Sequence, residues 1–380
     1  MPGGSVRIGR LAGIPIGINP LWLLIVALIT WSLGTAYYPD QVSGIAPTAA
    51  YALGLASALL LFASIVLHEL GHAVVARRCG VTIEGIDLWL LGGVAKLRGS
   101  PHRPEDELRY AAAGPAVTVG IALFFGLVVL ALPTGTPDAV RALIEYQLFI
   151  NVMILAFNLL PAFPLDGGRI LRALAWSRVG DMTRATSIAA TVGRGFAYGF
   201  IFIGVLAALQ GAPGGLWLSL IGLFLALAGR AEESAQQVRT ALGGHQAGEL
   251  MAFPAVVIPA ELTVEEATSA FARYRYRSFP VLDGERVLGL LTIDRVEALP
   301  PARHASTLTR DLVETDPDLF VDEEADIVEL LQRPGFQRLG RAIVVARGGV
   351  GILSITEVQR AVRAMRLRSG RASPAVPAAR

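Results

Sequence analysis

Residues 49–76 read AAYALGLASALLLFASIVLHELGHAVVA, an apolar run as long as a membrane-spanning helix that contains the pentapeptide His68-Glu69-Leu70-Gly71-His72. Charged and metal-binding side chains are costly within a membrane, so their presence there indicates a functional site. Residues four apart share one helix face, and His68 and His72 can therefore hold one tetrahedral Zn²⁺ between them. Glu69 lies beside them, where its carboxylate can act on a water molecule at the metal.

The composition is too apolar for an ordinary soluble protein of 380 residues, because 53% of the residues are hydrophobic, only 17% are charged and the mean hydropathy is +0.54. A spanning helix needs about 20 mostly apolar residues. Segments that meet this requirement lie near 20–38, 49–76, 110–132, 142–165, 186–209 and 215–230. After Arg230 the sequence becomes charged and mixed. We therefore predict a six-helix membrane domain over residues 1–232, followed by a soluble part.

Basic residues are distributed unevenly over the connections between these segments. The connections around residues 38–47, 133–139 and 210–215 contain no Lys or Arg. The positive-inside rule then places both termini of a multi-pass cell-membrane protein in the cytoplasm, with the first segment as a retained helix rather than a removable signal peptide. The basic residues that define the cytoplasmic side are Arg7, Arg10, Arg77, Arg78, Lys96, Arg98, Arg103, Arg109, Arg169, Arg172, Arg178 and Arg184.

The net charge of +2 and the pI near 8.8 do not indicate a nucleic-acid partner, because most of the basic residues flank membrane helices. We exclude nucleic acid as a partner on this ground. The single cysteine, Cys79, excludes an intrachain disulfide and is expected to be a free thiol on the cytoplasmic side.

A third zinc ligand must come from another part of the chain, because a catalytic zinc usually takes three protein ligands. Residues 158–169 read NLLPAFPLDGGR, in which an apolar helix is broken by prolines and glycines. Such irregular backbone is tolerated at membrane depth only where it is buried in protein or lines a watery cavity. The second and fourth segments run in the same direction, so their ends reach a similar depth, and Asp166 is the predicted third ligand.

Alternatives to these assignments remain open at this point. Asp166 could be an ordinary turn residue before two glycines. Asn158 could donate a hydrogen bond to a bound carbonyl or a developing oxyanion, or form an interhelical hydrogen bond instead. The other histidines, which lie in loops or in the soluble part, are weaker candidates for ligands: His102, His245 and His304.

The two motifs together, His68-Glu69-x-x-His72 and Asn158-x₂-Pro161-x₂-Pro164-x-Asp166-Gly167, resemble those of the site-2 protease family of intramembrane zinc metalloproteases. The resemblance covers about residues 10–230. It implies one Zn²⁺ per chain held by His68, His72 and Asp166, with Glu69 activating the water that attacks a peptide bond. It also implies a membrane protein substrate with a single span, such as an anti-sigma factor or a signal-peptide remnant.

Two further stretches are similar to elements of this family. Residues 81–97 alternate like β-strands and resemble the membrane-embedded strands of the family, whose edge could pair with an unwound substrate, although a simple connecting hairpin fits equally well. Ala113-Gly114-Pro115 resembles the family's Gly-Pro element. That element usually has Asn three residues after the proline, and here Thr118 takes its place, which leaves the role of that Asn in question.

Residues 244–300 and 301–365 look like two copies of one unit, each with an N-terminal strand, an acidic helix start and a β-hairpin. In the first copy Thr263 is expected to cap a helix. The pair resembles a tandem cystathionine-β-synthase (CBS) domain, in this case cytoplasmic. Residues 366–380 are rich in Arg, Ser, Ala and Pro and are predicted to form a disordered tail.

CBS pairs often bind adenine nucleotides, which the resemblance implies as a second ligand. The ribose-contacting Asp of such pairs usually follows a Thr or Ser by three residues. Here Arg295 and Glu357 occupy those places, with Asp294 one position early. Nucleotide binding and a purely structural or homodimerising role therefore both remain open.

These observations predict an α-helical multi-span membrane protein with six transmembrane helices, a small β element after the second helix, and an α/β CBS pair. The predicted function is that of an intramembrane zinc endopeptidase acting in the lipid bilayer. The alternative is a membrane transporter or channel gated by the CBS pair, because broken helices and intramembrane Asp residues also mark ion pathways. That alternative requires more polar residues along several helices than the sequence offers.

Overall fold

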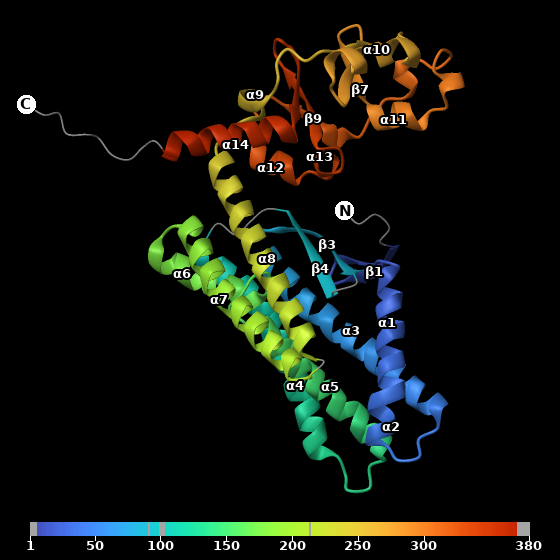
Figure 1. The fold of residues 1–380 in the computed structure, drawn as a ribbon, viewed down its shortest axis with the longest axis vertical. Coiled ribbons are helices and arrows are strands. Elements are labelled where there is room, and N and C mark those ends of the chain that lie inside the picture. The colour runs from blue at the N-terminus through green and yellow to red at the C-terminus, as the bar shows by residue number, and fades with distance from the viewer. Residues whose placement is uncertain (1–5, 90–91, 99–102, 213, 371–380) are drawn as a thin grey trace, which may run out of the picture. The chain divides into compact units, whose positions relative to one another are not determined.

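The computed structural model describes residues 6–89, 92–98, 103–212 and 214–370. The chain divides between Gln236 and Gln237 into two compact units, which we call the membrane unit and the C-terminal unit (Figure 1). The division falls within one helix, α8.

The described residues of the membrane unit contain six helices long and apolar enough to cross a membrane, which confirms the predicted number. The first span combines α1 (Leu21–Ser32), a π-helical turn (Leu33–Tyr37) and α2 (Tyr38–Gln41). The other spans are α3 (Pro47–Arg78), α4 (Pro104–Ala131), α5 (Asp138–Asn158), α7 (Met182–Leu209) and α8 (Gly214–Leu242), and a shorter helix, α6 (Asp166–Val179), lies between α5 and α7.

The largest differences from the predicted segment ends occur at the ends of the fourth and sixth segments. The segment predicted over 142–165 ends as a helix at Asn158, because Pro161 and Pro164 interrupt the backbone pattern that a helix requires. The last segment was predicted to end at 230, but α8 continues to Leu242. Glu233 accepts hydrogen bonds from Arg194 and Ser187 of α7, and such pairing lets the helix continue through charged residues.

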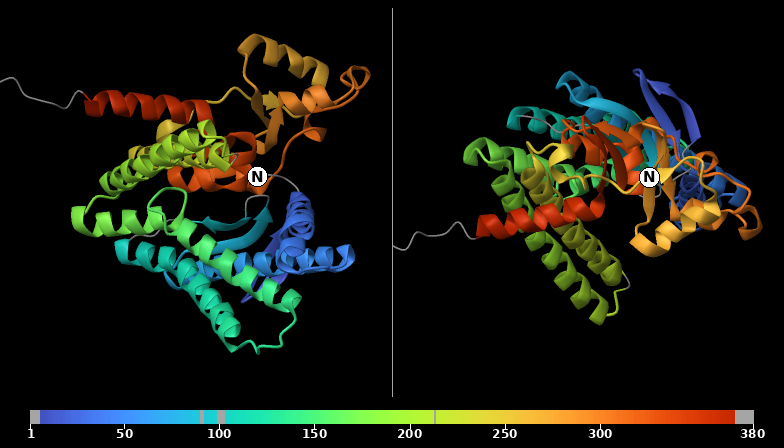
Figure 2. Two further views of the ribbon diagram at one scale, coloured as in Figure 1. Left: turned by 60° about the horizontal axis from the view of Figure 1, so that its bottom comes forward. Right: turned by 90° about the horizontal axis from the view of Figure 1, so that it is seen from above.

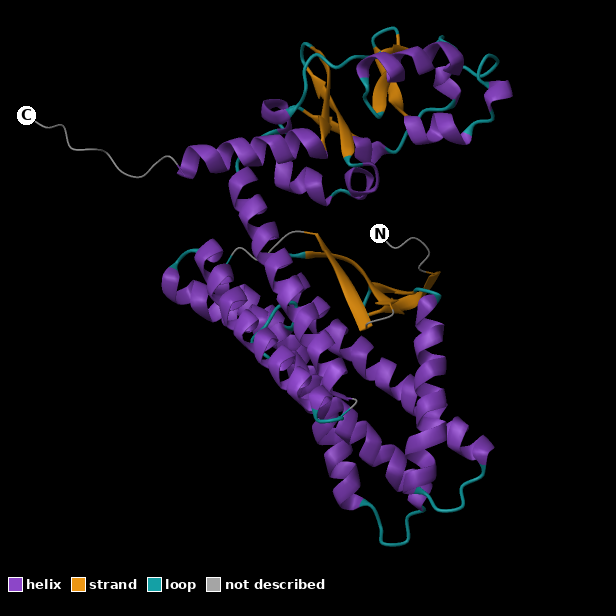
Figure 3. Ribbon diagram, in the orientation of Figure 1, coloured by secondary structure: helices purple, strands orange, loops and turns teal. Residues whose placement is uncertain are grey.

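The membrane unit also contains a four-stranded sheet in the order β1-β2-β3-β4 (Figure 3). The predicted β element after the second helix is the antiparallel hairpin of β3 (Thr82–Trp89) and β4 (Gly92–Arg98). Leu90 and Leu91 lie outside the described residues. The N-terminal hairpin, β1 (Val6–Leu11) and β2 (Ile14–Ile18), was not predicted.

The N-terminal hairpin covers the half of α3 that carries the histidines. Its β2 strand pairs in parallel with β3, with Ile16 opposite Ile86. Ile14 and Ile86 pack against Ala73, the residue after His72. The turn that forms the hairpin, Ala12-Gly13, has positive φ at both residues, and two β-type runs around a short glycine-containing turn are a recognisable hairpin signal.

Helix α4 is the central element of the membrane unit, because it contacts α3, α5 and α6 (Figures 1 and 2). The crossing of α3 and α4 is close at Gly71, where an added Cβ would lie 2.9 Å from the carbonyl oxygen of Ala113. Small residues permit such close backbone approach between membrane helices. The histidine-bearing turn of α3 is therefore held directly against α4.

The C-terminal unit contains two repeats with the same sheet topology. In the first, β5 (Ile258–Pro259) pairs in parallel with β6 (Ser278–Asp283), which forms an antiparallel hairpin with β7 (Arg286–Thr292). In the second, β8 (Phe320–Asp322), β9 (Arg341–Ala346) and β10 (Gly349–Ser354) repeat this order. The helices of the unit are α9 (Ala247–Leu250), α10 (Val264–Tyr274), α11 (Ile293–Ala298), α12 (Ile327–Gln332), α13 (Pro334–Leu339) and α14 (Ile355–Gly370).

Local features of the C-terminal unit agree with the sequence in one place and differ in another. Thr263 caps α10 in a reciprocal capping box with Glu266, as predicted. The last turn of α14 covers residues 366–370, which the sequence placed in a disordered tail. Residues 371–380 lie outside the described residues.

The close contact between α1 and α3 generates a stability prediction. A Cβ added to Gly54 would lie 2.7 Å from the backbone oxygen of Thr30, whereas one added to Gly195 in α7 would meet nothing within 4 Å. We expect Gly54→Ala to lower the free energy of unfolding by about 1–3 kcal/mol, because overpacking forces the helices apart. Thermal unfolding in detergent measures this effect. Gly195→Ala is the matched control, and an equal response of both variants would contradict the close-packing explanation.

Candidate metal centre

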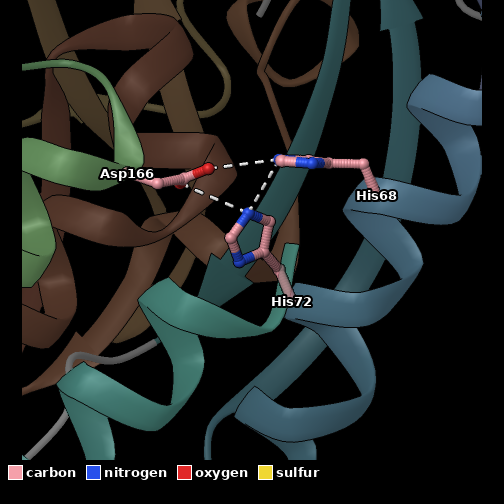
Figure 4. Close-up of side chains that lie close together, drawn as sticks. All are labelled: His68, His72 and Asp166. Atoms are coloured by element: carbon pink, nitrogen blue, oxygen red, sulfur yellow. Dashed lines mark hydrogen bonds and ion pairs between the residues drawn. The ribbon is translucent and has the colours of Figure 1, made fainter. Parts of the chain in front are cut away.

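The structure brings the three predicted ligands together from two helices (Figure 4). His68 and His72 project from α3, and Asp166 is the first residue of α6. The Nε2 atoms of the two histidines are 3.1 Å apart. The carboxylate of Asp166 lies 3.1 Å from Nε2 of His68 and 3.3 Å from Nε2 of His72. Both histidines are buried, and the Asp166 side chain is only 13% exposed.

Hydrogen bonds on the far side of each imidazole ring fix which nitrogen carries the proton. Nδ1 of His72 lies 2.8 Å from the backbone oxygen of Tyr110, which can only accept, so Nδ1 is the donor. Nδ1 of His68 lies 2.8 Å from the hydroxyl of Thr118, and that hydroxyl donates its own hydrogen to the backbone oxygen of Gly114. In the neutral rings, both Nε2 atoms therefore present lone pairs to each other and to Asp166.

This donor set fits a zinc ion. Two imidazole lone pairs and a carboxylate at 3.1–3.3 Å repel one another unless a cation or a shared proton lies among them. Nitrogen and carboxylate oxygen are ligands that Zn²⁺ prefers, and three protein ligands leave a fourth position for catalysis. The outward N–H groups held by a backbone oxygen and a hydroxyl are the outer-shell contacts typical of zinc-binding histidines.

Gly114 of α4 provides the space in which the two rings meet. A Cβ at this position would lie 2.1 Å from Nε2 of His72 and 2.6 Å from Nε2 of His68. Any side chain here would displace the rings from the observed arrangement. The residue of the Gly-Pro element that the site requires is therefore the glycine.

The irregular segment between α5 and α6 is buried at its centre, whereas Leu159 and Pro164 are exposed. Irregular backbone is tolerated at membrane depth where it is buried in protein or lines a watery cavity. Ala162 and Phe163 are almost completely inaccessible to solvent. Gly167 and Gly168 pack against this segment, because an added Cβ would lie 2.3 Å from the backbone oxygen of Leu159 or 2.6 Å from the backbone carbon of Ala162, respectively. This packing fixes the start of α6 and with it the carboxylate of Asp166.

Glu69 is partly buried on α3 and lies within electrostatic range of both imidazoles and of Asp166. Within the described part of the chain its carboxylate forms no hydrogen bond or ion pair, so it is available as a base.

Asn158, also partly buried, is the last residue of α5. Among the described residues, no hydrogen bond involves its side chain, so neither of the two roles considered for it is seen.

The remaining candidates lie apart from this cluster. His245 pairs with Glu249, and His304 contacts the backbone oxygen of Leu299. His102 lies outside the described residues. Cys79 is a free, partly buried thiol that is not part of the metal-binding group.

Tyr110 is not among the residues predicted from the sequence, yet it contacts the site through its backbone and its ring. Its hydroxyl accepts a hydrogen bond of 3.1 Å from Arg169, whose guanidinium also lies over the ring. Tyr110, Gly114 and Thr118 follow one another at spacings of four residues, so they share one face of α4. That spacing is visible in the sequence, but the backbone contact of Tyr110 is not.

Comparisons with known proteins match both units. The family model described as peptidase family M50 matches residues 56–140 and 136–200, and the CBS-domain model matches residues 247–297. Rip3 of Mycobacterium tuberculosis, named as a zinc metalloprotease, is 33% identical over 372 residues, which is 96% of this chain and 94% of that protein. A relative from Synechocystis with a similar name is 34% identical over 92% of this chain and 93% of its own.

Among solved structures, the site-2 protease from Methanocaldococcus jannaschii is 32% identical and matches 60% of this chain and 95% of its own, with a TM-score of 0.39. The M50 model covers both the His68–His72 motif and Asp166. Relatives that are about one third identical match nearly the whole chain. The chain therefore belongs to peptidase family M50, the site-2 proteases, and carries a CBS domain in its C-terminal unit.

Proposed function

We propose that the chain is an intramembrane zinc endopeptidase that hydrolyses a peptide bond within or near a transmembrane segment of another protein. The observation that carries the proposal is the convergence of His68 and His72, on a helix of spanning length, with Asp166 of α6. The carboxylate of Glu69 lies beside them and has no hydrogen-bond or ion-pair partner among the described residues. Membership of the site-2 protease family supports it and disfavours the alternative of a CBS-gated transporter or channel.

The proposed roles follow from the chemistry of the side chains. His68, His72 and Asp166 would hold one Zn²⁺, which when bound would polarise both a water molecule and the scissile carbonyl. Glu69 would take the proton of the attacking water and deliver it to the leaving amine. Tyr110 and Thr118 hold the two rings through Nδ1, so that both Nε2 atoms remain available.

Asn158 is proposed to donate a hydrogen bond to the developing oxyanion, and a contact between α3 and α5 supports this role. The side-chain amide of Gln147 donates to the backbone oxygen of Ser57 at 3.1 Å, which ties the two helices together. Both helices lead toward the site. Asn158 lies eleven residues after Gln147 on α5, and His68 lies eleven residues after Ser57 on α3. The equal rise along both helices, roughly 16 Å, brings Asn158 to a level near the metal centre.

The substrate is proposed to be a single-span protein in the cell membrane, such as an anti-sigma factor or a signal-peptide remnant. A helix hides its peptide bonds, so the substrate must be locally unwound before cleavage. The β4 strand lies at an edge of the sheet, where an extended chain could add by β-augmentation.

The distribution of Lys and Arg between the spans supports a cytoplasmic position of both the N- and the C-terminus.

Glu69→Gln tests the proposed function. We expect cleavage of a membrane-embedded reporter to fall by at least about 100-fold, because the general base is removed. Zinc content should stay at the wild-type level. Asp166→Ala should lose zinc as well as activity, and Glu145→Gln, at a half-buried position of α5 that pairs with Arg141, should change neither. Cleavage by Glu69→Gln at the wild-type rate would refute the mechanism.

Gly114→Ala tests whether the space between the rings is required. The added methyl group would overlap Nε2 of both His68 and His72, so we expect loss of zinc from the purified protein. Gly120→Ala in the same helix is the control, because its Cβ would meet nothing within 4 Å. Metal analysis of both variants measures the effect. Full zinc retention in Gly114→Ala would contradict the proposed position of the metal.

Two roles are considered for the C-terminal unit, adenine nucleotide binding and a purely structural or homodimerising role. Arg295 donates to the carboxylate of Glu314, Asp294 pairs with Arg277, and Glu357 contacts the hydroxyl of Ser354. These contacts favour the structural role, because they occupy the side chains nearest to the expected ribose position. We therefore expect no binding heat when the full-length protein is titrated with ATP and AMP. Saturable binding would instead show that the C-terminal unit binds adenine nucleotide.

A further inference from the structure

A buried ion-pair cluster joins three helices of the membrane unit. Arg172 of α6 donates from Nε to a carboxylate oxygen of Glu107 in α4 at 2.6 Å. Its Nη1 atom donates to Glu232 of α8 at 2.7 Å, and its Nη2 atom lies 2.5 Å from Glu107. The side chains of Arg172 and Glu107 are only 6% and 1% exposed. None of these residues belongs to the metal centre.

The cluster joins α6, which carries Asp166, to α4, which packs against both histidines. On α6, Arg172 follows Asp166 by six residues, with Arg169 between them. On α4, Glu107 precedes Tyr110 by three residues, and the backbone oxygen of Tyr110 orients His72. The two helices are thus joined twice, by Arg172 to Glu107 and by Arg169 to the Tyr110 hydroxyl, on the side that leads away from the ligands.

Stability alone does not explain this cluster. Removing an arginine and a carboxylate from water is costly, and a well-packed apolar pair is often as stable as a buried ion pair or more stable. One carboxylate oxygen of Glu107 is buried and has no hydrogen-bond partner within the described part of the chain, so the pairing there is not fully satisfied. A planar guanidinium with several fixed donors does, however, determine the relative position of the groups it binds.

We propose that Arg172 is a positioning residue whose clamp on Glu107 fixes the register of α6 against α4. The register of α6 determines where Asp166 lies, and that of α4 determines where the Tyr110 oxygen holds His72. The clamp would thereby set the distance between the carboxylate and the imidazoles. This inference rests on the proposed function, in which these groups bind zinc.

The dimensions of a helix show how sensitive the site is to this register. One helical turn spans about 5.4 Å, so a slip of half a turn would move Asp166 by roughly 2.7 Å. Such a shift is nearly as large as the observed separations of 3.1 and 3.3 Å between the carboxylate and the two Nε2 atoms, so it would disrupt their arrangement. Glu232 extends the clamp to α8, the helix in which the chain passes from the membrane unit to the C-terminal unit.

The test replaces Arg172 by Lys, which keeps the buried charge but has a single donor centre in place of the fork. The matched control is Arg194→Lys. Arg194 of α7 pairs with Glu233 of α8 at 2.8 Å, one residue from Glu232, and α7 carries none of the three ligands. The control therefore makes the same substitution in a neighbouring ion pair that involves neither α6 nor α4.

Zinc affinity of the purified full-length protein is measured by competition with a chelator. The melting temperature is measured in parallel with and without zinc. We expect Arg172→Lys to bind zinc about 10- to 100-fold more weakly, the range typical of outer-shell changes, and to show a smaller rise in melting temperature on zinc addition. The affinity of Arg194→Lys should stay within about twofold of wild type, since no outer-shell contact changes. A fall in kcat at nearly constant KM should accompany the loss in Arg172→Lys.

The possible results distinguish a failure of the inference about Arg172 from a failure of the proposed function. A lower melting temperature of zinc-free Arg172→Lys with unchanged zinc affinity would show a merely structural role and overturn the inference, as would an equal loss of affinity in both Lys variants. Failure of the wild-type protein to retain zinc would overturn the proposed function itself. If Lys at position 172 prevents folding, Glu107→Gln with Glu233→Gln as its control repeats the comparison from the acidic side, with the same expected difference.

Discussion

The metal centre depends on one electrostatic constraint, the close approach of two imidazole lone pairs and a carboxylate among apolar helices. His68, His72 and Asp166 bring these atoms to within 3.1–3.3 Å of one another. Such an arrangement persists only with a cation or a shared proton among the three, and only if the rings cannot rotate away. Hydrogen bonds at both Nδ1 atoms prevent that rotation, and Gly114 leaves the space in which the rings meet.

Helix α4 serves as the template on which this arrangement is built. Glu107, Tyr110, Gly114 and Thr118 follow one another at spacings of three or four residues, so they lie along one buried face. Each contacts a different part of the site: the clamp on α6, the ring of His72, the two Nε2 atoms, and the ring of His68. A single rigid helix thus fixes elements from α3 and α6, which gives greater precision than loops could provide.

The sequence predicted the six spans, and it singled out the three side chains that the structure brings together, because costly polar residues in apolar runs are conspicuous. It could not predict the backbone acceptor at Tyr110, since a carbonyl group has no sequence signature. The pairing of Glu107 with Arg172 was also missed, because charged residues near helix ends are usually cytoplasmic flanks. Thr118 departs from the family pattern, yet its hydroxyl provides the hydrogen bond that holds His68.

The placement of the ligands follows the cost of each charge. Neutral imidazoles can lie within α3, because the uncharged ring is tolerated among apolar side chains once both nitrogens have partners. A fully buried carboxylate that must stay charged is more costly there, and the carboxylate that α3 carries beside the rings, Glu69, is only partly buried. Asp166 instead begins α6, where the free N–H groups of the first turn and the helix dipole favour an anion and so maintain the deprotonated form that a metal requires. A continuous fourth helix through residue 166 would offer no such terminus, and the break after Asn158 is what creates it.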